Sequence, residues 1–166
     1  MCVACHAPSR PPGRGLGLHG HGLRDRQLRG PRAVDAPAIT IVLEVRRYRC
    51  TSCGAILTVV PRGVAPRRHY GHAAIALAFT LWAIVGASVA EVRRRVCAWP
   101  ISTEAPQQWR APRRWAHAAR GALGLPTATA HAVAARAAQV AMGRAPPVLH
   151  GAPAAALAFA GGSLMP

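Results

Sequence analysis

Two Cys-x-x-Cys pairs constrain this chain more than any other feature. The first pair is Cys2 and Cys5, and the second is Cys50 and Cys53. A two-residue spacer lets both sulfurs of a pair reach one ion, and four thiolates satisfy the tetrahedral preference of Zn²⁺. Gly54 suits the second pair, since the residue after such a pair often needs a positive φ, whereas the first pair has no following glycine. The spacing predicts one Zn²⁺ ion held by all four cysteines.

Strand patterns flank the second cysteine pair. Residues 39–45 alternate apolar and polar side chains, and residues 55–60 can return as an antiparallel partner that Pro61 ends. Residues 16–24 suggest a looser edge strand. Two to three antiparallel strands with two cysteine knuckles make a zinc ribbon. A core this small predicts that metal binding supplies much of the folding free energy, about 10 kcal/mol.

Helical patterns follow from residue 70. Residues 73–90 carry no charge, and Ser88 with Glu91 forms a capping-box pattern that begins a second helix, which Pro100 ends. A third helix begins near Pro112 and stops at Gly121. An Ala-rich helix over residues 127–142 comes next.

These patterns together predict an α+β protein. We expect a zinc-ribbon domain over residues 1–66, a helix-turn-helix-like domain over 70–125, an Ala-rich helix within 126–143 and a disordered, low-complexity tail over 144–166. The link of residues 100–111 is longer than the three- or four-residue turn of a compact helix-turn-helix.

The charge balance points to a polyanionic partner. The chain has 21 arginines, no lysine and five acidic residues, which gives a net charge of +16. Such an excess attracts nucleic acid and, as a second option, an anionic membrane surface. A mutational bias toward GC-rich codons would also raise the arginine content without any selection for binding. Arginine suits bidentate contacts to phosphate and guanine, and the predicted DNA contacts are Arg46, Arg47, Arg49, Arg67, Arg68, Arg93, Arg94, Arg95, Arg113 and Arg114.

The cysteines and histidines allow other uses. Cys2, Cys5 and His6 match the C-x-x-C-H pattern of haem attachment, but that chemistry needs export, no secretory signal is visible, and the second pair would be unexplained. Paired Cys-x-x-Cys motifs in a cytoplasmic protein favour metal over disulfides. Cys97 is expected to be a small buried side chain. His6, His19 and His21 are alternative zinc ligands, although we expect them to be solvated side chains in loops.

Three rival functions remain beside DNA binding. Residues 73–90 reach the length of a membrane span, although their alanines, Gly86 and the capping box favour a buried helix of a small bundle. A protein-interaction module would dock through Leu77, Leu81 and Trp82. A non-functional remnant of a mobile element would also carry these features.

A family pattern covers about residues 2–72. The first Cys-x-x-Cys pair is followed by His19-Gly20 and Arg24, then by a strand that ends in Arg-Arg-Tyr-Arg-Cys-Thr-Ser-Cys-Gly over residues 46–54. The motifs Leu-Thr-Val-Val-Pro at 57–61 and Pro-Arg-Arg-His-Tyr at 66–70 complete the pattern. This pattern resembles the N-terminal zinc-binding domain of insertion-sequence transposases, and short bacterial proteins that carry that domain alone.

The resemblance implies a zinc site and a partner. It implies that Cys2, Cys5, Cys50 and Cys53 are the zinc ligands, and that the protein binds transposon DNA or a transposase or recombinase. A transposase nuclease needs a carboxylate triad, and the five scattered acidic residues do not provide one. We therefore expect a cytoplasmic, non-enzymatic, transposon-related DNA-binding protein.

Overall fold

The computed structural model describes residues 1–65, 68–99 and 109–165. Its contacts divide the chain into two compact units, Met1–Gln27 with Val42–Pro61, and Leu28–Ile41 with Arg62–Pro166. Residues 28–41 group with the helices because Arg29 pairs with Tyr70 in a β-bridge and Asp35 pairs with Arg95.

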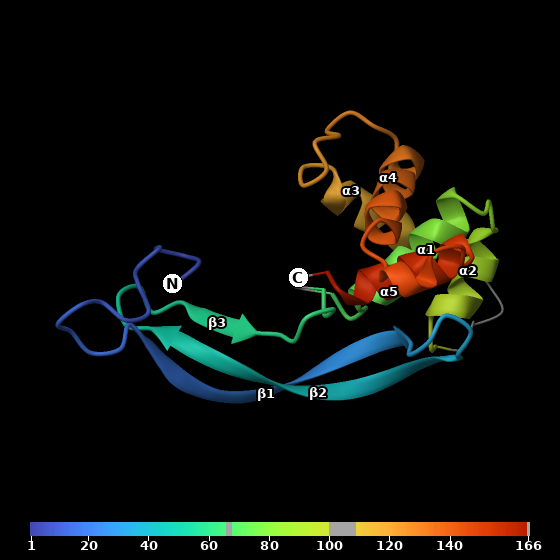
Figure 1. The fold of residues 1–166 in the computed structure, drawn as a ribbon. Coiled ribbons are helices and arrows are strands. Elements are labelled where there is room, and N and C mark those ends of the chain that lie inside the picture. Colours follow the sequence, from blue (N-terminus) through green and yellow to red (C-terminus); the bar gives the residue numbers. More distant parts are fainter. Residues whose placement is uncertain (66–67, 100–108, 166) are drawn as a thin grey trace. The chain divides into compact units, whose positions relative to one another are not determined.

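A three-stranded antiparallel sheet confirms the predicted strands (Figure 1). Its strands are β1 (Leu18–Pro31), β2 (Ala38–Cys50) and β3 (Ile56–Val59), in the order β1-β2-β3. β2 and β3 pair from Arg46 opposite Val59 to Arg49 opposite Ile56. β1 continues beyond the expected residues 16–24, so β1 and β2 form a long hairpin whose outer strand is β1.

The first unit has very little apolar core. Its buried apolar side chains within the described residues are Val45 and two cysteines, Cys2 and Cys50. Leu23, Val42, Ile56 and Val59 are exposed. Burial of one valine cannot offset the conformational entropy of about fifty ordered residues, so this unit needs another source of stability.

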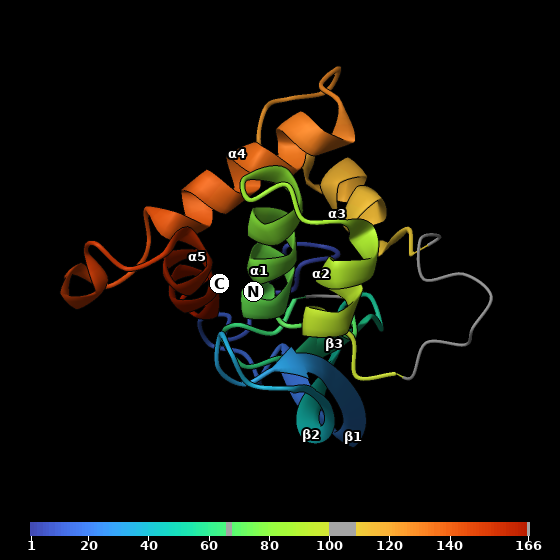
Figure 2. The same ribbon diagram turned by 90° about the vertical axis from the view of Figure 1, so that its right-hand side faces the viewer.

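The second unit contains the five α-helices found among the described residues. They are α1 (His72–Ala83), α2 (Val89–Val96), α3 (Ala111–Ala119), α4 (Ala130–Met142) and α5 (Ala154–Ser163), with a short 3-10 helix η2 (Pro147–Leu149) before α5. Figure 2 shows α1 between α2 and α5, and α1 also contacts α3 and α4. The central position of α1 explains its uncharged sequence, because it has neighbours on several sides.

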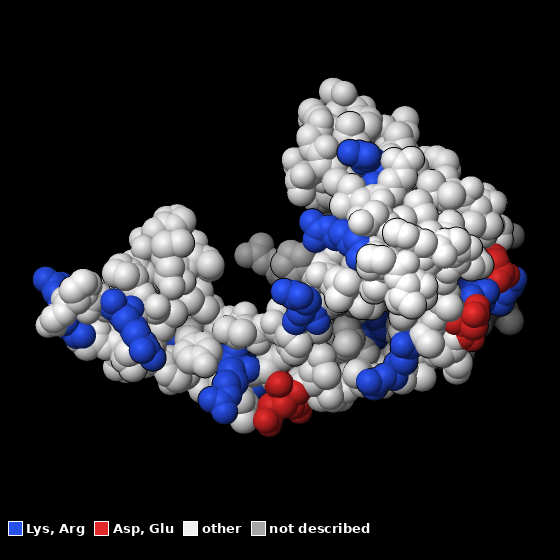
Figure 3. Space-filling view, in the orientation of Figure 1, with Lys and Arg blue, Asp and Glu red and all other residues white. Residues whose placement is uncertain are grey.

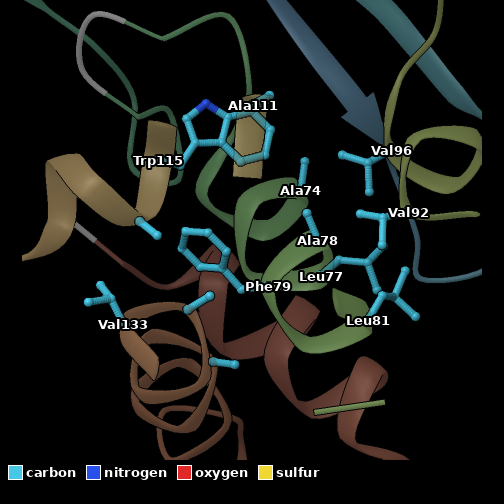
Figure 4. Close-up of a cluster of buried hydrophobic side chains, with 13 residues drawn as sticks. Ala74, Leu77, Ala78, Phe79, Leu81, Val92, Val96, Ala111, Trp115 and Val133 are labelled. Atoms are coloured by element: carbon cyan, nitrogen blue, oxygen red, sulfur yellow. The ribbon is translucent and has the colours of Figure 1, made fainter. Parts of the chain in front are cut away.

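The core of this unit forms around α1 (Figure 4). Leu77, Phe79 and Leu81 of α1 are buried against Val92 and Val96 of α2, Trp115 of α3 and Val133 of α4. Leu77 and Leu81, through which the rival protein-interaction module would dock, are therefore used within the chain. None of the helices in the described ranges is long and apolar enough to cross a membrane.

Hydroxyl side chains cap the starts of α2 and α4, and α4 begins at Ala130 rather than at the expected residue 127. The Ser88 hydroxyl accepts a hydrogen bond from the Glu91 amide at 3.2 Å and begins α2, which confirms the capping-box prediction. The Thr129 hydroxyl does the same for the Ala132 amide at the start of α4. Gly86, with φ of 77°, lies in the turn between α1 and α2.

The expectation of a disordered tail was wrong. Residues 154–163 form α5, which packs on α1 and α4 with Ala158, Gly161 and Gly162 buried. Small residues let the backbones of these helices approach closely. The chain end is also tied down, since the Gly63 amide donates to the Met165 carbonyl at 3.1 Å. The low-complexity composition hides this helix, because its stability depends on its fit to α1 and α4.

Candidate metal centre

The two cysteine knuckles have the same backbone hydrogen bonds. The Cys2 amide donates to the Ala7 carbonyl, and the Cys50 amide donates to the Ala55 carbonyl, both at 2.9 Å. The carbonyl of each first cysteine accepts from the amide four residues later, His6 at 2.9 Å and Gly54 at 3.0 Å. The two pairs are therefore built alike, although only the second has a glycine.

A positive φ follows the second cysteine of each pair. Gly54 has φ of 73°, as the sequence predicts, and His6 has φ of 58° at the equivalent position. His6 is the one non-glycine residue with positive φ among the described residues. Histidine tolerates this conformation better than most side chains do, at some energetic cost.

Substitutions at these equivalent positions should act in opposite directions. Gly54→Ala should lower the stability of the zinc-loaded protein by about 1–2 kcal/mol, because a Cβ there meets no atom within 4 Å and the cost is the backbone strain alone. His6→Gly should be neutral or stabilising by up to about 0.5 kcal/mol, since relief of strain is offset by greater freedom in the unfolded chain. Thermal unfolding of both variants measures this. A fully stable Gly54→Ala variant would show that the knuckle does not need its positive φ.

The four sulfur atoms lie together at the spacing of a metal centre. All four Sγ atoms, from Cys2, Cys5, Cys50 and Cys53, are within 4.8 Å of one another. The Cys2 and Cys53 sulfurs are 3.8 Å apart, and those of Cys5 and Cys50 are 3.7 Å apart. A tetrahedral site with Zn–S bonds of about 2.3 Å has sulfur–sulfur edges of about 3.8 Å. A disulfide needs about 2.05 Å, so the arrangement fits a metal such as Zn²⁺ and contains no disulfide.

Backbone amides already favour thiolate in part of the cluster. Hydrogen bonds from the Cys5 and Ala4 amides lower the pKa of Cys2, and the Ala4 amide lies 3.4 Å from its Sγ. The Cys53 and Ser52 amides, against the effect of burial, lower the pKa of Cys50 to about 6. The Ala7 amide favours the thiolate of Cys5, but the Cys53 sulfur and loss of solvent outweigh it and raise the pKa of Cys5 to about 12. Four sulfurs this close share their protons, and a divalent cation would replace those protons.

A loop between the knuckles holds them in place, and sequence reasoning missed it. The Gly17 amide donates to the Ser9 carbonyl at 2.8 Å, and the Gly17 carbonyl accepts from the Thr51 amide at 3.0 Å. A Cβ at Gly17 would collide with the Pro8 carbonyl oxygen. Gly17 therefore links the chain after the first knuckle to the second knuckle. A buried glycine in a Gly-rich loop gives no sequence signal of such a role.

The other candidate ligands stay outside the sulfur cluster. The four-residue cluster contains none of His6, His19 and His21, and the His19 ring bonds the Leu16 carbonyl at 2.9 Å. Cys97 is half-buried in the second unit rather than fully buried. Burial, followed by the effect of the Cys97 thiol, raises the pKa of Tyr70.

The predicted arginines of the first unit lie on β2. Arg46 and Arg49 are exposed and Arg47 is half-buried, with its guanidinium near Gly22 of β1. Because side chains alternate along a strand, Arg47 and Arg49 share one face of the sheet and Arg46 lies on the other with Tyr48. All three directly precede the second knuckle.

The predicted arginines of the second unit differ in their partners. Arg94 pairs with Glu91, and Arg95 bonds both the Asp35 carboxylate at 2.9 Å and the Val34 carbonyl at 3.0 Å. Arg113 and Arg114 are exposed on α3. Arg68 and Arg93 are half-buried, and Arg67 lies outside the described residues.

Figure 3 shows the basic side chains as separate groups on the face in view, with acidic side chains beside some of them. In the second unit, two ion pairs bring opposite charges together, Arg94 with Glu91 and Arg95 with Asp35. Exposed arginines occur in both units, and Arg46 and Arg49 of β2 lie within four residues of Cys50 in the sequence.

Comparison with known proteins identifies one family. A domain of unknown function, DUF6431, matches residues 12–98, a segment that runs from before β1 to the end of α2 and includes Cys50 and Cys53. The comparisons with curated proteins and with solved structures each gave no significant match. Since the match covers more than half of its residues, the chain belongs to the DUF6431 family.

Proposed function

We propose that this protein is a zinc-ribbon protein whose single Zn²⁺ ion folds the β-hairpin that binds DNA. The observation that carries the proposal is the cluster of four sulfurs, with edges of 3.7 and 3.8 Å that fit one tetrahedral ion. The weak core of the first unit supports it, because a metal supplies the stability that this unit lacks.

The ligand set supports a structural rather than a catalytic ion. Four protein sulfurs complete a tetrahedral zinc site, so no position remains for water or substrate. Cys2 and Cys50 are buried, which restricts access to half of the ligands. We propose a non-enzymatic role on this ground, and a cytoplasmic location, where thiols stay reduced.

DNA is the proposed partner because arginines adjoin the metal centre. Arg46, Arg47 and Arg49 come from the strand that ends at Cys50, so a metal-held knuckle would fix their spacing. Arginine binds phosphates through a rigid pair of donors. The likeness of residues 46–54 to the transposase zinc-binding domain supports transposon DNA, or a transposase or recombinase bound to it, as the context.

A second basic surface is proposed on α3. Pro112, Trp115 and Ala116 are buried, whereas Arg113, Arg114 and His117 are exposed. Helices of helix-turn-helix proteins contact base edges with residues of their first turns, and Arg113 and Arg114 occupy such positions. Arg94 and Arg95 fit this role less well, because each is already paired within the chain.

Salt dependence tests the DNA proposal. The triple variant Arg46→Gln, Arg47→Gln, Arg49→Gln should weaken binding to duplex DNA. It should also reduce the slope of log K against log salt by about 0.9 for each phosphate that the variant no longer neutralises, so by about 2.7 in all. Fluorescence anisotropy with labelled duplex over a range of salt concentrations measures both quantities.

The matched control is Arg136→Gln, Arg144→Gln, which removes exposed charge from α4 and from the residues that follow it, and leaves β2 and α3 unchanged. It should leave the slope within about 0.5 of the native value. Equal reductions per charge in the two variants would mean attraction by net charge alone. That result would contradict a binding surface on β2.

A further inference from the structure

The second unit contains a cavity that the proposed function does not use. Its volume is about 230 Å³, and it lies among the ends of β1 and β2, the start of α1 and the end of α5. Every lining residue belongs to the second unit. The cavity is therefore separate from the cysteine cluster and from the arginines that precede it.

Three arginines line this cavity. They are Arg29, Arg32 and Arg62, and among the described lining residues no acidic side chain accompanies them. Arg32 and Arg62 are exposed to solvent. Arg29 lies over the Trp99 ring, with its guanidinium carbon 4.9 Å from the ring centroid. The exposed guanidinium groups of Arg32 and Arg62 favour a negatively charged occupant.

Backbone amides add to this preference. Gly71 is the N-cap of α1 and gives no side-chain cap, the first turn has no acidic residue, and Gly71, Ala73 and Ala74 line the cavity. The His72 amide donates to the Gly63 carbonyl at 2.7 Å, and the partial positive charge of the helix start lies beside the cavity, which Ala73 and Ala74 of the first turn line. On its own this would be an ordinary helix start, but here it faces the same space as the arginines.

The rest of the lining is apolar. Ile39 and Ile41 of β2 and Phe159 of α5 contribute the larger apolar side chains. A bare inorganic ion would leave this surface uncovered, and a neutral apolar molecule would leave the arginines without an anion. The volume is below the range of about 300–1,000 Å³ usual for drug-sized ligands, so the occupant is small.

We propose that this cavity binds a small organic anion, with a carboxylate or phosphate head at Arg32 and Arg62 and a short apolar body against Ile39, Ile41 and Phe159. Two exposed arginines can grip such a head through charge-assisted hydrogen bonds. The apolar body removes surface of both partners from water. The head group chemistry is shared by carboxylic acids and phosphate monoesters.

Titration of the full chain with four probes tests the proposal. The probes are hexyl phosphate, hexanoate, hexanol and inorganic phosphate, followed by NMR chemical shifts or calorimetry at low salt. At least one of the two amphiphilic anions should bind about tenfold or more tightly than both hexanol and inorganic phosphate, and the stronger of the two identifies the head group. Failure of both to bind, or inorganic phosphate binding equally well, would overturn the proposal.

Variants locate the site. Arg32→Gln with Arg62→Gln should weaken binding about tenfold or more, and Arg136→Gln with Arg144→Gln, which removes the same charge elsewhere, less than about twofold. Ile39→Glu, at a position that is 37% exposed, places a carboxylate at the cavity and should weaken binding by a similar factor without touching an arginine. Equal weakening in the two double variants, or unchanged binding by Ile39→Glu in folded protein, would show that the anion binds elsewhere. DNA binding and zinc content are measured in separate experiments. Absence of anion binding in this cavity would therefore not contradict the proposed function.

Discussion

Removal of the metal should unfold the first unit and leave the helical unit folded. Structural zinc contributes about 10–16 kcal/mol in small zinc domains near neutral pH. The first unit buries Val45, two cysteines of the cluster and little else, so it has no comparable source of stability. The second unit has a separate core around Leu77 and Val133.

The number of cysteines that react with an alkylating reagent measures this unfolding. In the metal-bound protein one of the five cysteines, Cys97, should react with an alkylating reagent, and after chelation all five should react. NMR resonances of residues 42–61 should lose their dispersion at the same chelator concentration.

Two cysteine variants separate loss of metal from loss of a thiol. Cys50→Ser removes a buried ligand and should unfold the first unit. Cys97→Ser removes the cysteine outside the cluster and should leave metal content unchanged. A Cys50→Ser variant whose first unit stayed folded, as that of Cys97→Ser should, would show that the metal does not stabilise this unit.

The second large effect is expected at Gly161. A Cβ at this position would overlap the backbone carbonyl oxygen of Ala141 and lie 3.0 Å from the Ala145 amide nitrogen. Backbone atoms cannot rotate away as a side chain can, so α5 must move off α4. Gly161→Ala should therefore lower the free energy of unfolding by about 1–3 kcal/mol, the range of overpacked cores.

Gly121→Ala is the matched control for this substitution. Gly121 lacks a positive φ, and an added Cβ meets no atom within 4 Å. This change should be neutral or stabilising by less than about 1 kcal/mol. Denaturant unfolding followed by tryptophan fluorescence compares the two variants. A Gly161→Ala protein as stable as Gly121→Ala would mean that α5 does not pack closely on α4.

Local sequence signals predicted the elements whose cause is local. The Ser88 hydroxyl starts α2, and Gly54 takes the positive φ expected of a knuckle. Alternation of apolar residues predicted β2, and the paired cysteines predicted the sulfur cluster. In each case a few neighbouring residues decide the geometry.

The features that were missed depend on distant contacts or on backbone hydrogen bonds that residue types do not reveal. α5 has a composition typical of disorder, but its glycines fit the backbones of α1 and α4. The positive φ of His6 follows from the hydrogen bonds of the first knuckle, and Gly17 acts through carbonyl and amide groups that any residue has. Arg94 and Arg95 look free in the sequence, but their acceptors include Asp35, which is sixty residues away.

X-ray absorption at the zinc edge tests the central claim most directly. The protein is purified without added metal, and native mass spectrometry counts the metal ions bound per chain. We predict one Zn²⁺ ion per chain with four sulfur neighbours at about 2.3 Å. A folded first unit without metal, or an ion with nitrogen or oxygen among its neighbours, would contradict a centre built from Cys2, Cys5, Cys50 and Cys53.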